Sequence, residues 1–512
     1  MPVFVTAREA VGHIRSGTHV WSNAFLALAN PIELQTALGA AVRETGQPRD
    51  LTFCCTSGFG DWTEDSSNED FVRLGAVNSF ILGHISSMPA TARMIMENKV
   101  EGYNLPLGVM SKMVRAAASG ENYFITDIGL NLFVDPKYHG YRLNRRSGEE
   151  LVTDMVIDGK RRLKYRIPPM DVALIKGSYA DDEGNVSFEK ECTVGDALSL
   201  AQAVKRQKGI VIVQVEGVLH RHQRPWNVVI PAPLIDMIAV CPEQTQVAGL
   251  HGYIPAYAGD EYFTADPMRD YVLKIEASNP PARIERKLIA RRALKEFKSG
   301  DIANIGIGIP EGVAVEAAKS GLLHQAVLTV ESGAMHGVPA SGKAFGAAIG
   351  AHSICDMAHQ FDFYDGGGLD ICFIGALEID REGNVNGHVS EGRLPGIGGF
   401  ANITQSTPKV VFCATFTAEG LEVSEKNGQV RIIHEGRRPK LVKKVKAISF
   451  SAENAHNNGQ EVLYITERCV FRLGKDGLEL IEAAPGIDIQ KDILDHLDFS
   501  PAVSISKEEG GH

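Results

Sequence analysis

The stretch VLTVESGAMHGVPASG, residues 327–342, is the segment around which the rest of the chain is organised. Its first four residues, 327–330, are apolar or β-branched and predict a short buried strand. Glu331 follows where that strand should end, and the small pair Ser332-Gly333 comes next. Ligands of open α/β sheets bind at the carboxyl ends of the strands, and small residues allow a ligand to approach closely. We therefore expect Glu331 to carry chemistry and Gly333 to contact a substrate.

Composition limits the classes of protein that fit this chain. At 512 residues it is too long for one hydrophobic core, so roughly two to four domains are expected. A hydrophobic content of 44% and a charged content of 22% are typical of a globular protein in water. The net charge of −11 and the absence of a Lys/Arg run argue against a nucleic-acid binder.

The cysteine pattern and the ends of the chain bear on location. Eight cysteines are scattered without CxxC pairing, mostly in apolar runs, which favours reduced, buried thiols in a cytoplasmic protein. The N-terminus lacks the order of a signal peptide, and no apolar run approaches the ~20 residues that span a bilayer. His220 and His222 lack a Cys or acidic partner at zinc-like spacing, so no metal site is predicted.

Apolar strand-like runs alternate with helical stretches along most of the chain, which predicts an α/β fold with mainly parallel sheets. The runs at 79–85, 102–111 and 122–130 continue this alternation, whereas the polar segment from about 131 to 165 is expected to form a small excursion. Pro280-Pro281 cannot lie inside a helix, and 284–298 is strongly helical. These features predict two domains, roughly 1–275 and 285–512.

Two pieces of the first half return in the second. DVALIKGSYADDEGNV (171–186) aligns with DICFIGALEIDREGNV (370–385), and both contain an Asp-x-Glu-Gly-Asn-Val turn. IRSGTHV…ANPIEL (14–34) resembles FKSGDIA…GIPEGV (297–313). One shared turn would be weak evidence, because these residues suit any tight turn. Two matches in the same order indicate an internal duplication into two related α/β halves.

Three glycine-rich turns lie in the second half. DIANIGIGIPEGV (301–313) reads as a strand, a Gly-x-Gly turn and a helix start that could bind an anion, but it lacks the GxGxxG spacing of a nicotinamide site. In FYDGGGLD (363–370), Gly366 and Gly367 predict close approach of a ligand or another backbone. GRLPGIGGFANITQ (392–405) could supply backbone N–H groups to an oxyanion, with Asn402 beside the substrate. The alternative for 301–313 is only a tight strand-to-helix turn, and for 392–405 it is a flexible surface loop.

Other catalytic classes fit less well. No GxSxG nucleophile elbow or phosphate-binding P-loop is present, and Ser332 lacks a preceding glycine, which disfavours a serine hydrolase. His84 and His336 lie near glycines and could touch a substrate. A lone histidine is more often a structural residue, so neither is placed in the catalytic set.

VESGAMHG (330–337), FDFYDGGGLDICFIGALEIDREGNVN (361–386), GIGGFANITQ (396–405), VVFCATFTAEGLEV (410–423) and VLYITERCVFRL (462–473) resemble the family I CoA-transferases, most closely the single-chain acetate/propionate type. The resemblance spans nearly the whole chain. It implies an open α/β fold in each half, an active-site glutamate at Glu331 and a glycine-rich oxyanion loop at Gly398-Gly399-Phe400. It also implies coenzyme A as a substrate, no further cofactor, and a homo-oligomer, either a dimer or a tetramer.

The first half departs from the family pattern at two places. Members usually carry Gly-Gly-Phe before the first helix, where this chain has Asn23-Ala24-Phe25. The segment 101–111 resembles one that normally reads Pro-Gln-Gly, but Leu107 replaces the glutamine, leaving only a backbone N–H there, beside Gly108. Leu107 and Gly108 are thus predicted to contact the substrate, and both departures bear on acyl specificity.

The resulting hypothesis is a ping-pong transfer of CoA from a short-chain acyl-CoA to a carboxylic acid such as acetate or propionate. Glu331 would attack the donor thioester, and CoA thiolate would then convert the anhydride into a glutamyl-CoA thioester. An acyl-CoA hydrolase, with water as acceptor, is the alternative. A sugar-phosphate isomerase or a ligand-sensing regulator comes last, because no basic helix-turn-helix candidate appears.

Overall fold

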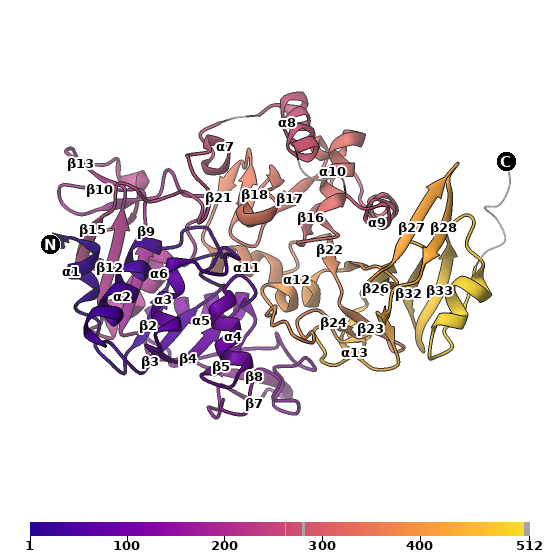
Figure 1. The fold of residues 1–512 in the computed structure, drawn as a ribbon, viewed down its shortest axis with the longest axis horizontal. Helices are drawn as coiled ribbons and strands as arrows, with labels where there is room; N and C mark the ends of the chain where they lie inside the picture. Colours follow the sequence, from indigo (N-terminus) through magenta and orange to yellow (C-terminus); the bar gives the residue numbers. More distant parts are fainter. Residues whose placement is uncertain (262, 279–281, 506–512) are drawn as a thin grey trace.

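The structure is a computed structural model that describes residues 1–261, 263–278 and 282–505. Figure 1 shows two α/β parts side by side, one indigo to magenta and the other orange to yellow. Pro280-Pro281, on which the predicted domain boundary depends, lies outside the described residues.

The first part is built on an eight-stranded sheet in which every neighbouring pair of strands is parallel. In spatial order its strands are β1 (Val3–Val5), β15 (Met237–Val240), β12 (Ile210–Val215), β9 (Val172–Lys176), β2 (His19–Ser22), β3 (Leu51–Cys55), β4 (Val77–Leu82) and β5 (Glu101–Asn104). All of β9 is buried. Val172 and Leu174 belong to one apolar cluster, whereas Ala173 and Ile175 belong to another. This alternation shows that both faces of the sheet are covered, as parallel sheets require.

The second part is built on a ten-stranded sheet with a parallel centre. In spatial order its strands are β21 (Ser353–Ile354), β18 (Ala334–Met335), β17 (Val327–Thr329), β16 (Ile302–Ile305), β22 (Ile371–Gly375), β25 (Lys409–Cys413), β31 (Glu461–Ile465), β32 (Cys469–Gly474), β33 (Gly477–Ala483) and β34 (Ala502–Val503). The strands from β17 to β31 are parallel to one another, whereas β18, β21, β32 and β33 add antiparallel pairs at the sides. The fold is therefore α/β with mainly parallel sheets, as predicted.

The predicted duplication is confirmed by strand order. The series β15-β12-β9-β2-β3 in the first sheet corresponds to β31-β25-β22-β16-β17 in the second. The shared turn is also built in the same way in both halves. Asp181 Oδ1 accepts the Asn185 N–H at 2.8 Å, and Asp380 Oδ1 accepts the Asn384 N–H at 2.9 Å. A side-chain oxygen that closes its own turn explains why this motif survives in both copies.

The segment from 131 to 165 is a more ordered excursion than the sequence indicates. It contributes to the hairpin of β7 (Val152–Ile157) and β8 (Lys160–Arg166). The run at 122–130, expected to continue the parallel alternation, instead forms β6 (Tyr123–Thr126) and pairs antiparallel with β8. The expected parallel pairing of this run is wrong, because β6 pairs with β8, which belongs to the hairpin of the 131–165 segment.

Helices flank the two main sheets (Figure 1). Those of the first part are α1 (Ala7–Val11), α2 (Ile32–Thr45), α3 (Asp70–Arg73), α4 (Pro89–Met96), α5 (Leu107–Ser119) and α6 (Ala197–Arg206). The next two helices along the chain, α7 (Pro255–Ala258) and α8 (Ala265–Ser278), pack against elements of the second part. Those of the second part are α9 (Ile284–Leu294), α10 (Glu311–Ser320), α11 (Met357–Asp365), α12 (Phe400–Ser406) and α13 (Ala452–Asn458). The predicted helix at 284–298 thus ends at Leu294.

Short strands complete the two halves. They are β10 (Tyr179–Asp181), β11 (Val186–Ser187), β13 (Gly217–Leu219), β14 (Val228–Ile230), β19 (Val338–Pro339), β20 (Ala348–Ile349), β23 (Glu378–Asp380), β24 (Val385–Asn386), β26 (Thr417–Ala418), β27 (Glu422–Lys426), β28 (Gln429–His434), β29 (Arg438–Pro439) and β30 (Leu441–Val442). All eight cysteines are free thiols, and every one except the half-buried Cys355 is buried, as predicted. Within the described ranges, no helix is long and apolar enough to cross a membrane.

Candidate active site

A cavity of about 590 Å³ lies between the two halves. Its wall in the second half includes Ile305, Gly375 and Cys413, the last residues of β16, β22 and β25, together with Glu331 just beyond β17. The cavity therefore lies at the carboxyl ends of four parallel strands. This is the edge at which open α/β sheets bind their ligands.

Glu331 occupies a tight turn that is fixed on both sides. The Gly333 N–H donates to the Val330 carbonyl at 3.0 Å, and the Val330 N–H donates to the Ala334 carbonyl at 2.9 Å. Ser332 is fully buried; its hydroxyl donates to the Gly346 carbonyl, and its own carbonyl accepts the Thr193 hydroxyl at 2.6 Å. The turn is thus anchored to both halves of the chain, and the Glu331 side chain lines the cavity.

The environment of the Glu331 carboxylate disfavours its charge. Burial raises the pKa of Glu331 to about 7, and the nearby Gly399 N–H opposes this shift only in part. Its Oε2 is buried and makes no hydrogen bond of ordinary geometry. A carboxylate with one oxygen buried and little hydrogen bonding is poorly stabilised in its charged form, which makes the ionised group more reactive toward an electrophilic carbon.

Gly399 lies directly against the carboxylate. A β-carbon on this residue would overlap Glu331 Oε2 and would lie 3.0 Å from Glu331 Cδ. Gly399 immediately precedes α12, and no backbone carbonyl accepts its N–H among the described hydrogen bonds. Of the two glycines predicted for the oxyanion loop, Gly399 therefore has its N–H directed at the reacting group.

Gly398 does not fit its predicted role. Its N–H donates to the Gly83 carbonyl at 2.8 Å, and its carbonyl accepts the Leu107 N–H at 2.9 Å. The expectation that the Gly398 N–H stabilises an oxyanion is wrong because this donor is already used. The Leu107 N–H is likewise already used as a donor, so it is not available to an oxyanion, although Leu107 does line the cavity.

The loop that carries these glycines is packed against the first half. The Pro395 carbonyl accepts the Ile85 N–H at 2.9 Å, and a β-carbon on Gly396 would lie 2.9 Å from the Cα of His84. The glycines of this loop allow the two backbones to meet. A freely mobile surface loop, the alternative considered for it, does not agree with these contacts.

Gly108 and Asn402 do not line the cavity, contrary to prediction. A β-carbon on Gly108 would lie 2.6 Å from Cγ of Phe361 and 2.7 Å from Cγ of Asn402. Asn402 is fully buried and donates through Nδ2 to Asp365 at 3.0 Å. These residues join α5, α11 and α12 across the two halves, so their close contacts are with protein rather than substrate.

The remaining predicted glycines are also structural. Gly333 has φ +119°, and a β-carbon there would overlap the Cys355 carbonyl, so the group that approaches it is protein backbone. Gly366 and Gly367 are exposed residues between the end of α11 and the start of β22. They therefore lie at the amino end of that strand, whereas the cavity lies at the carboxyl ends. Predicted substrate contact is wrong for all three.

The structure also adds cationic groups that the sequence did not single out. These lining residues are Arg283, Arg286, Arg393, Arg438 and Lys440. Lys440 is nearly buried, donates to the Ala376 carbonyl at 2.9 Å, and has a pKa lowered to about 8 by desolvation. Guanidinium and ammonium groups are suited to phosphates. They come from three separate regions of the second half, at 283–286, 393 and 438–440, so no single sequence motif links them.

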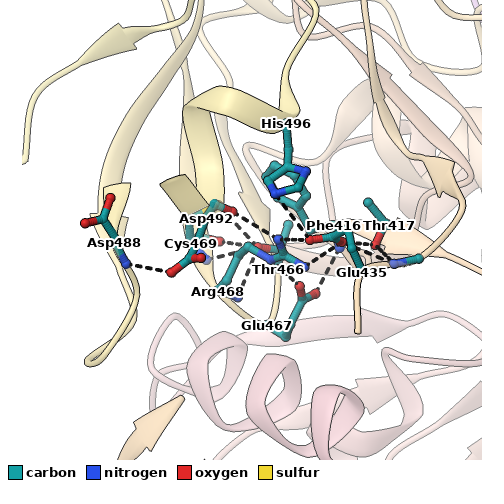
Figure 2. A network of polar contacts seen from close by, with 11 residues as sticks. Phe416, Thr417, Glu435, Thr466, Glu467, Arg468, Cys469, Asp488, Asp492 and His496 are labelled. Atoms are coloured by element: carbon teal, nitrogen blue, oxygen red, sulfur yellow. Dashed lines mark hydrogen bonds and ion pairs between the residues drawn. The ribbon is translucent and has the colours of Figure 1, made fainter. Parts of the chain in front are cut away.

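One wall of the cavity is held by a buried arginine (Figure 2). Arg468 is fully buried and donates to Glu467 at 2.7 Å and to Glu435 at 2.7 and 3.0 Å. Glu467 in turn accepts the Phe416 N–H at 2.9 Å, and Glu435 accepts the hydroxyl of Thr417. Thr417 lines the cavity, so this cluster fixes the position of the wall.

Of the two histidines left out of the catalytic set, only His84 reaches the cavity. Its Nε2 is 3.3 Å from the Ser86 hydroxyl, and burial lowers its pKa to about 4. The ring of His336 instead stacks on that of His352, with centroids 4.3 Å apart. The sequence did indicate that His84 could reach the cavity, because it follows a predicted strand and a glycine. That pattern does not distinguish a cavity residue from a structural histidine.

The fold and the site together define an α/β protein whose cavity, at the carboxyl ends of the strands, holds the Glu331 carboxylate and several cationic side chains suited to phosphates. The family model described as coenzyme A transferase matches residues 4–240 and 287–491, and the chain belongs to that family. The resemblance inferred from the sequence is thereby confirmed.

Similar proteins cover nearly the whole chain. The acetate CoA-transferase YdiF of Escherichia coli K12 is 38% identical over 502 residues, covering 98% of this chain and 92% of YdiF. The caffeate CoA-transferase of Acetobacterium woodii is 39% identical over 526 residues, covering 99% and 96%. The crystal structure of the acyl-CoA transferase YdiF apoenzyme from E. coli O157:H7 matches with a TM-score of 0.89 and 36% identity, covering 98% of this chain and 94% of that one. A thioester complex of YdiF with CoA matches equally well.

Proposed function

We propose that this protein is a CoA-transferase that moves CoA from a short-chain acyl-CoA to a carboxylic acid such as acetate or propionate, with Glu331 as the nucleophile. The observation that carries the proposal is the desolvated Glu331 carboxylate, which lines a cavity at the carboxyl ends of the strands and has an unpartnered oxygen. The names of the relatives support the reaction class. The CoA thioester complex reported for YdiF supports a covalent route.

The chemistry follows from a carboxylate nucleophile. Glu331 attacks the thioester carbonyl carbon, the carbon–sulfur bond breaks, and CoA leaves as thiolate, which leaves a mixed anhydride between the acyl group and Glu331. The thiolate attacks the Glu331 carbonyl carbon, which releases the donor acid and forms a glutamyl-CoA thioester. The acceptor acid carries out the same steps in reverse, so the kinetics are ping-pong.

Residues around Glu331 contribute to the charge balance of these steps. When thiolate attacks the glutamyl carbonyl, negative charge develops on an oxygen beside the Gly399 N–H. A donor in that position contributes about 3–4 kcal/mol of transition-state stabilisation. The five cationic residues that line the cavity would bind the phosphates of CoA. Closure of the cavity by substrate would exclude water, which otherwise hydrolyses the anhydride.

Intact-mass measurement after adding acetyl-CoA alone tests the proposal. A CoA-sized adduct should form, map to the peptide that contains Glu331, and be absent in Glu331→Ala. Glu311→Ala is the matched control, because Glu311 also has a buried, unpartnered oxygen and a pKa raised to about 7 by burial, but does not line this cavity. Retention of turnover in Glu331→Ala would refute the role of Glu331.

The acyl-CoA hydrolase alternative uses the same glutamate with water as acceptor. It predicts CoA release at an undiminished rate when no acid is added. The transferase predicts that CoA remains on the enzyme until acetate or propionate is supplied.

We also propose that the protein works in the cytoplasm as a homo-oligomer, a dimer or tetramer, with no cofactor besides the substrate CoA and with domains at about 1–275 and 285–512. The apolar, reduced cysteines support the compartment. Light scattering of the purified protein measures the oligomeric state, and limited proteolysis tests whether the chain is cut between the two proposed domains.

A further inference from the structure

The charged residues that line the cavity are distributed unevenly between the two halves of the chain. Every Arg, Lys, Asp and Glu among the described lining residues lies at position 283 or later. The first half contributes apolar side chains, chiefly Phe25, Leu26, Trp62 and Leu107, together with uncharged polar groups. The cavity therefore has one charged side, where five cationic residues outnumber Glu285, Glu331 and Glu419, and one uncharged side.

This division orients the substrate. The phosphates of CoA carry several negative charges and match the cationic residues of the charged side. With CoA on that side and the thioester carbon at Glu331, the acyl group extends toward the first half. The inference rests on the proposed function, because it assumes that an acyl-CoA is the donor.

Contacts place Leu107 close to the nucleophile. The Leu107 N–H donates to the carbonyl of Gly398, and the next residue, Gly399, lies against the Glu331 carboxylate. The Leu107 side chain lines the cavity and is 1% exposed. It therefore forms part of the surface that an acyl chain bound at Glu331 would meet first.

The rest of the uncharged wall is preorganised. Phe25 is 1% exposed, and its ring lies 6.3 Å from that of Phe345, which also lines the cavity. The Leu26 N–H donates to the Gly58 carbonyl at 2.8 Å, and the Trp62 N–H donates to the Ser87 carbonyl at 2.9 Å. Because these loops bond to one another, the wall is formed before any substrate binds.

No charge on this wall would pair with a second carboxylate. The titratable group that the first half brings to the cavity is His84, which is neutral at physiological pH because burial lowers its pKa to about 4. Asp61 precedes Trp62, and Lys343 lies near Phe345, but these two residues pair with each other at 3.0 Å and do not line the cavity. Burying an unpaired carboxylate there would be costly.

We propose that the acyl subsite, formed by Phe25, Leu26, Trp62, Leu107 and Phe345, selects apolar monocarboxylic acids of four or more carbons over acetate and rejects dicarboxylic acids. Each methylene buried against such a wall favours binding. Leu107 is the specificity-determining residue, because its apolar side chain stands where a polar one would offer a hydrogen bond to a smaller or more polar acid.

Acceptor preference tests this proposal. With acetyl-CoA or butyryl-CoA as donor, kcat/KM is measured for acetate, butyrate and succinate. Butyrate should exceed acetate about tenfold, as expected for two buried methylenes. Succinate should fall about 100-fold below butyrate, because its distal carboxylate is desolvated without a partner. Acetate used as well as butyrate, or succinate within tenfold of butyrate, would overturn the proposal.

A matched pair of variants tests whether the acyl group binds on the uncharged side of the cavity, which the first half forms. Leu107→Gln and Ile307→Gln both replace an apolar residue of the cavity lining with a polar one of similar size, one in each half. Leu107→Gln should reduce the ratio of kcat/KM for butyrate to kcat/KM for acetate severalfold. Ile307→Gln should change the two kcat/KM values by the same factor. A larger effect from Ile307→Gln would place the acyl group on the other side. If no acid accepts CoA and no adduct forms on Glu331, the proposed function fails instead.

Discussion

A β-carbon on Gly399 would overlap Oε2 of Glu331. The carboxylate thus occupies the space that any side chain at position 399 would need. Gly399 has φ −81°, a conformation open to every residue, so glycine is required there by the nucleophile and not by the backbone.

Gly399→Ala should lower kcat about 100-fold, because the added methyl must displace the carboxylate by about 1 Å from its reacting position. Steady-state kinetics measure the effect. Gly392→Ala is the control for distortion of the same loop; Gly392 does not line the cavity and has open space around a β-carbon, but its φ of +68° strains an alanine there. Equal losses in the two variants would show that the loop, rather than the carboxylate contact, sets the rate.

Activity should follow the ionisation of Glu331. The pKa of this group is raised to about 7 by burial, and the ionised form is the nucleophile. The value of kcat/KM for the acyl-CoA should therefore fall about tenfold per pH unit below pH 7 and level off above it. A rate profile from pH 5 to pH 9 measures this. A flat profile down to pH 5 would contradict an ionisation near neutrality.

The same shift predicts that the nucleophile destabilises the fold at neutral pH. The folded chain holds the Glu331 proton up to about pH 7, whereas the unfolded chain loses it near the ordinary value of 4.5. Stability contributed by this group is therefore fully present below pH 4.5 and is lost as the pH rises to 7. Glu331→Gln should gain up to about 3 kcal/mol at pH 8 and nothing at pH 4. Calorimetric melting at both pH values checks the sign, and a variant less stable at pH 8 would contradict it.

Arg468→Met should destabilise the protein by about 3–5 kcal/mol, because it leaves Glu467 as an uncompensated buried charge. Denaturant titration measures the loss. Arg472→Met is the matched control in β32, the strand that begins just after Arg468; there an exposed arginine pairs with Glu479 and contributes about 1 kcal/mol or less. Adding Glu467→Gln to Arg468→Met should recover part of the loss. No recovery would mean that packing, and not charge, explains the effect.

The sequence predicted the position of Glu331 at the end of a buried strand because the relevant signal is local. An apolar run that ends in a glutamate predicts a buried strand with a polar group at its end, and β17 and Glu331 have that arrangement. The repeated Asp-x-Glu-Gly-Asn-Val turn revealed the duplication, since Asp181 and Asp380 each close their own turn. Both features depend on residues within a few positions of one another.

Which glycines face the substrate cavity was decided only by the tertiary structure. A glycine in a sequence shows that a side chain is excluded, but not what fills the space. At Gly333 it is the Cys355 carbonyl, at Gly108 the ring of Phe361, and at Gly399 the nucleophile itself. The cationic side chains and the apolar wall of the cavity were equally hidden, because their residues come from segments far apart in the chain. The sequence by itself determined the α/β halves and the position of Glu331 through short-range pattern, whereas the packing of one half against the other determined the surroundings in which that carboxylate reacts.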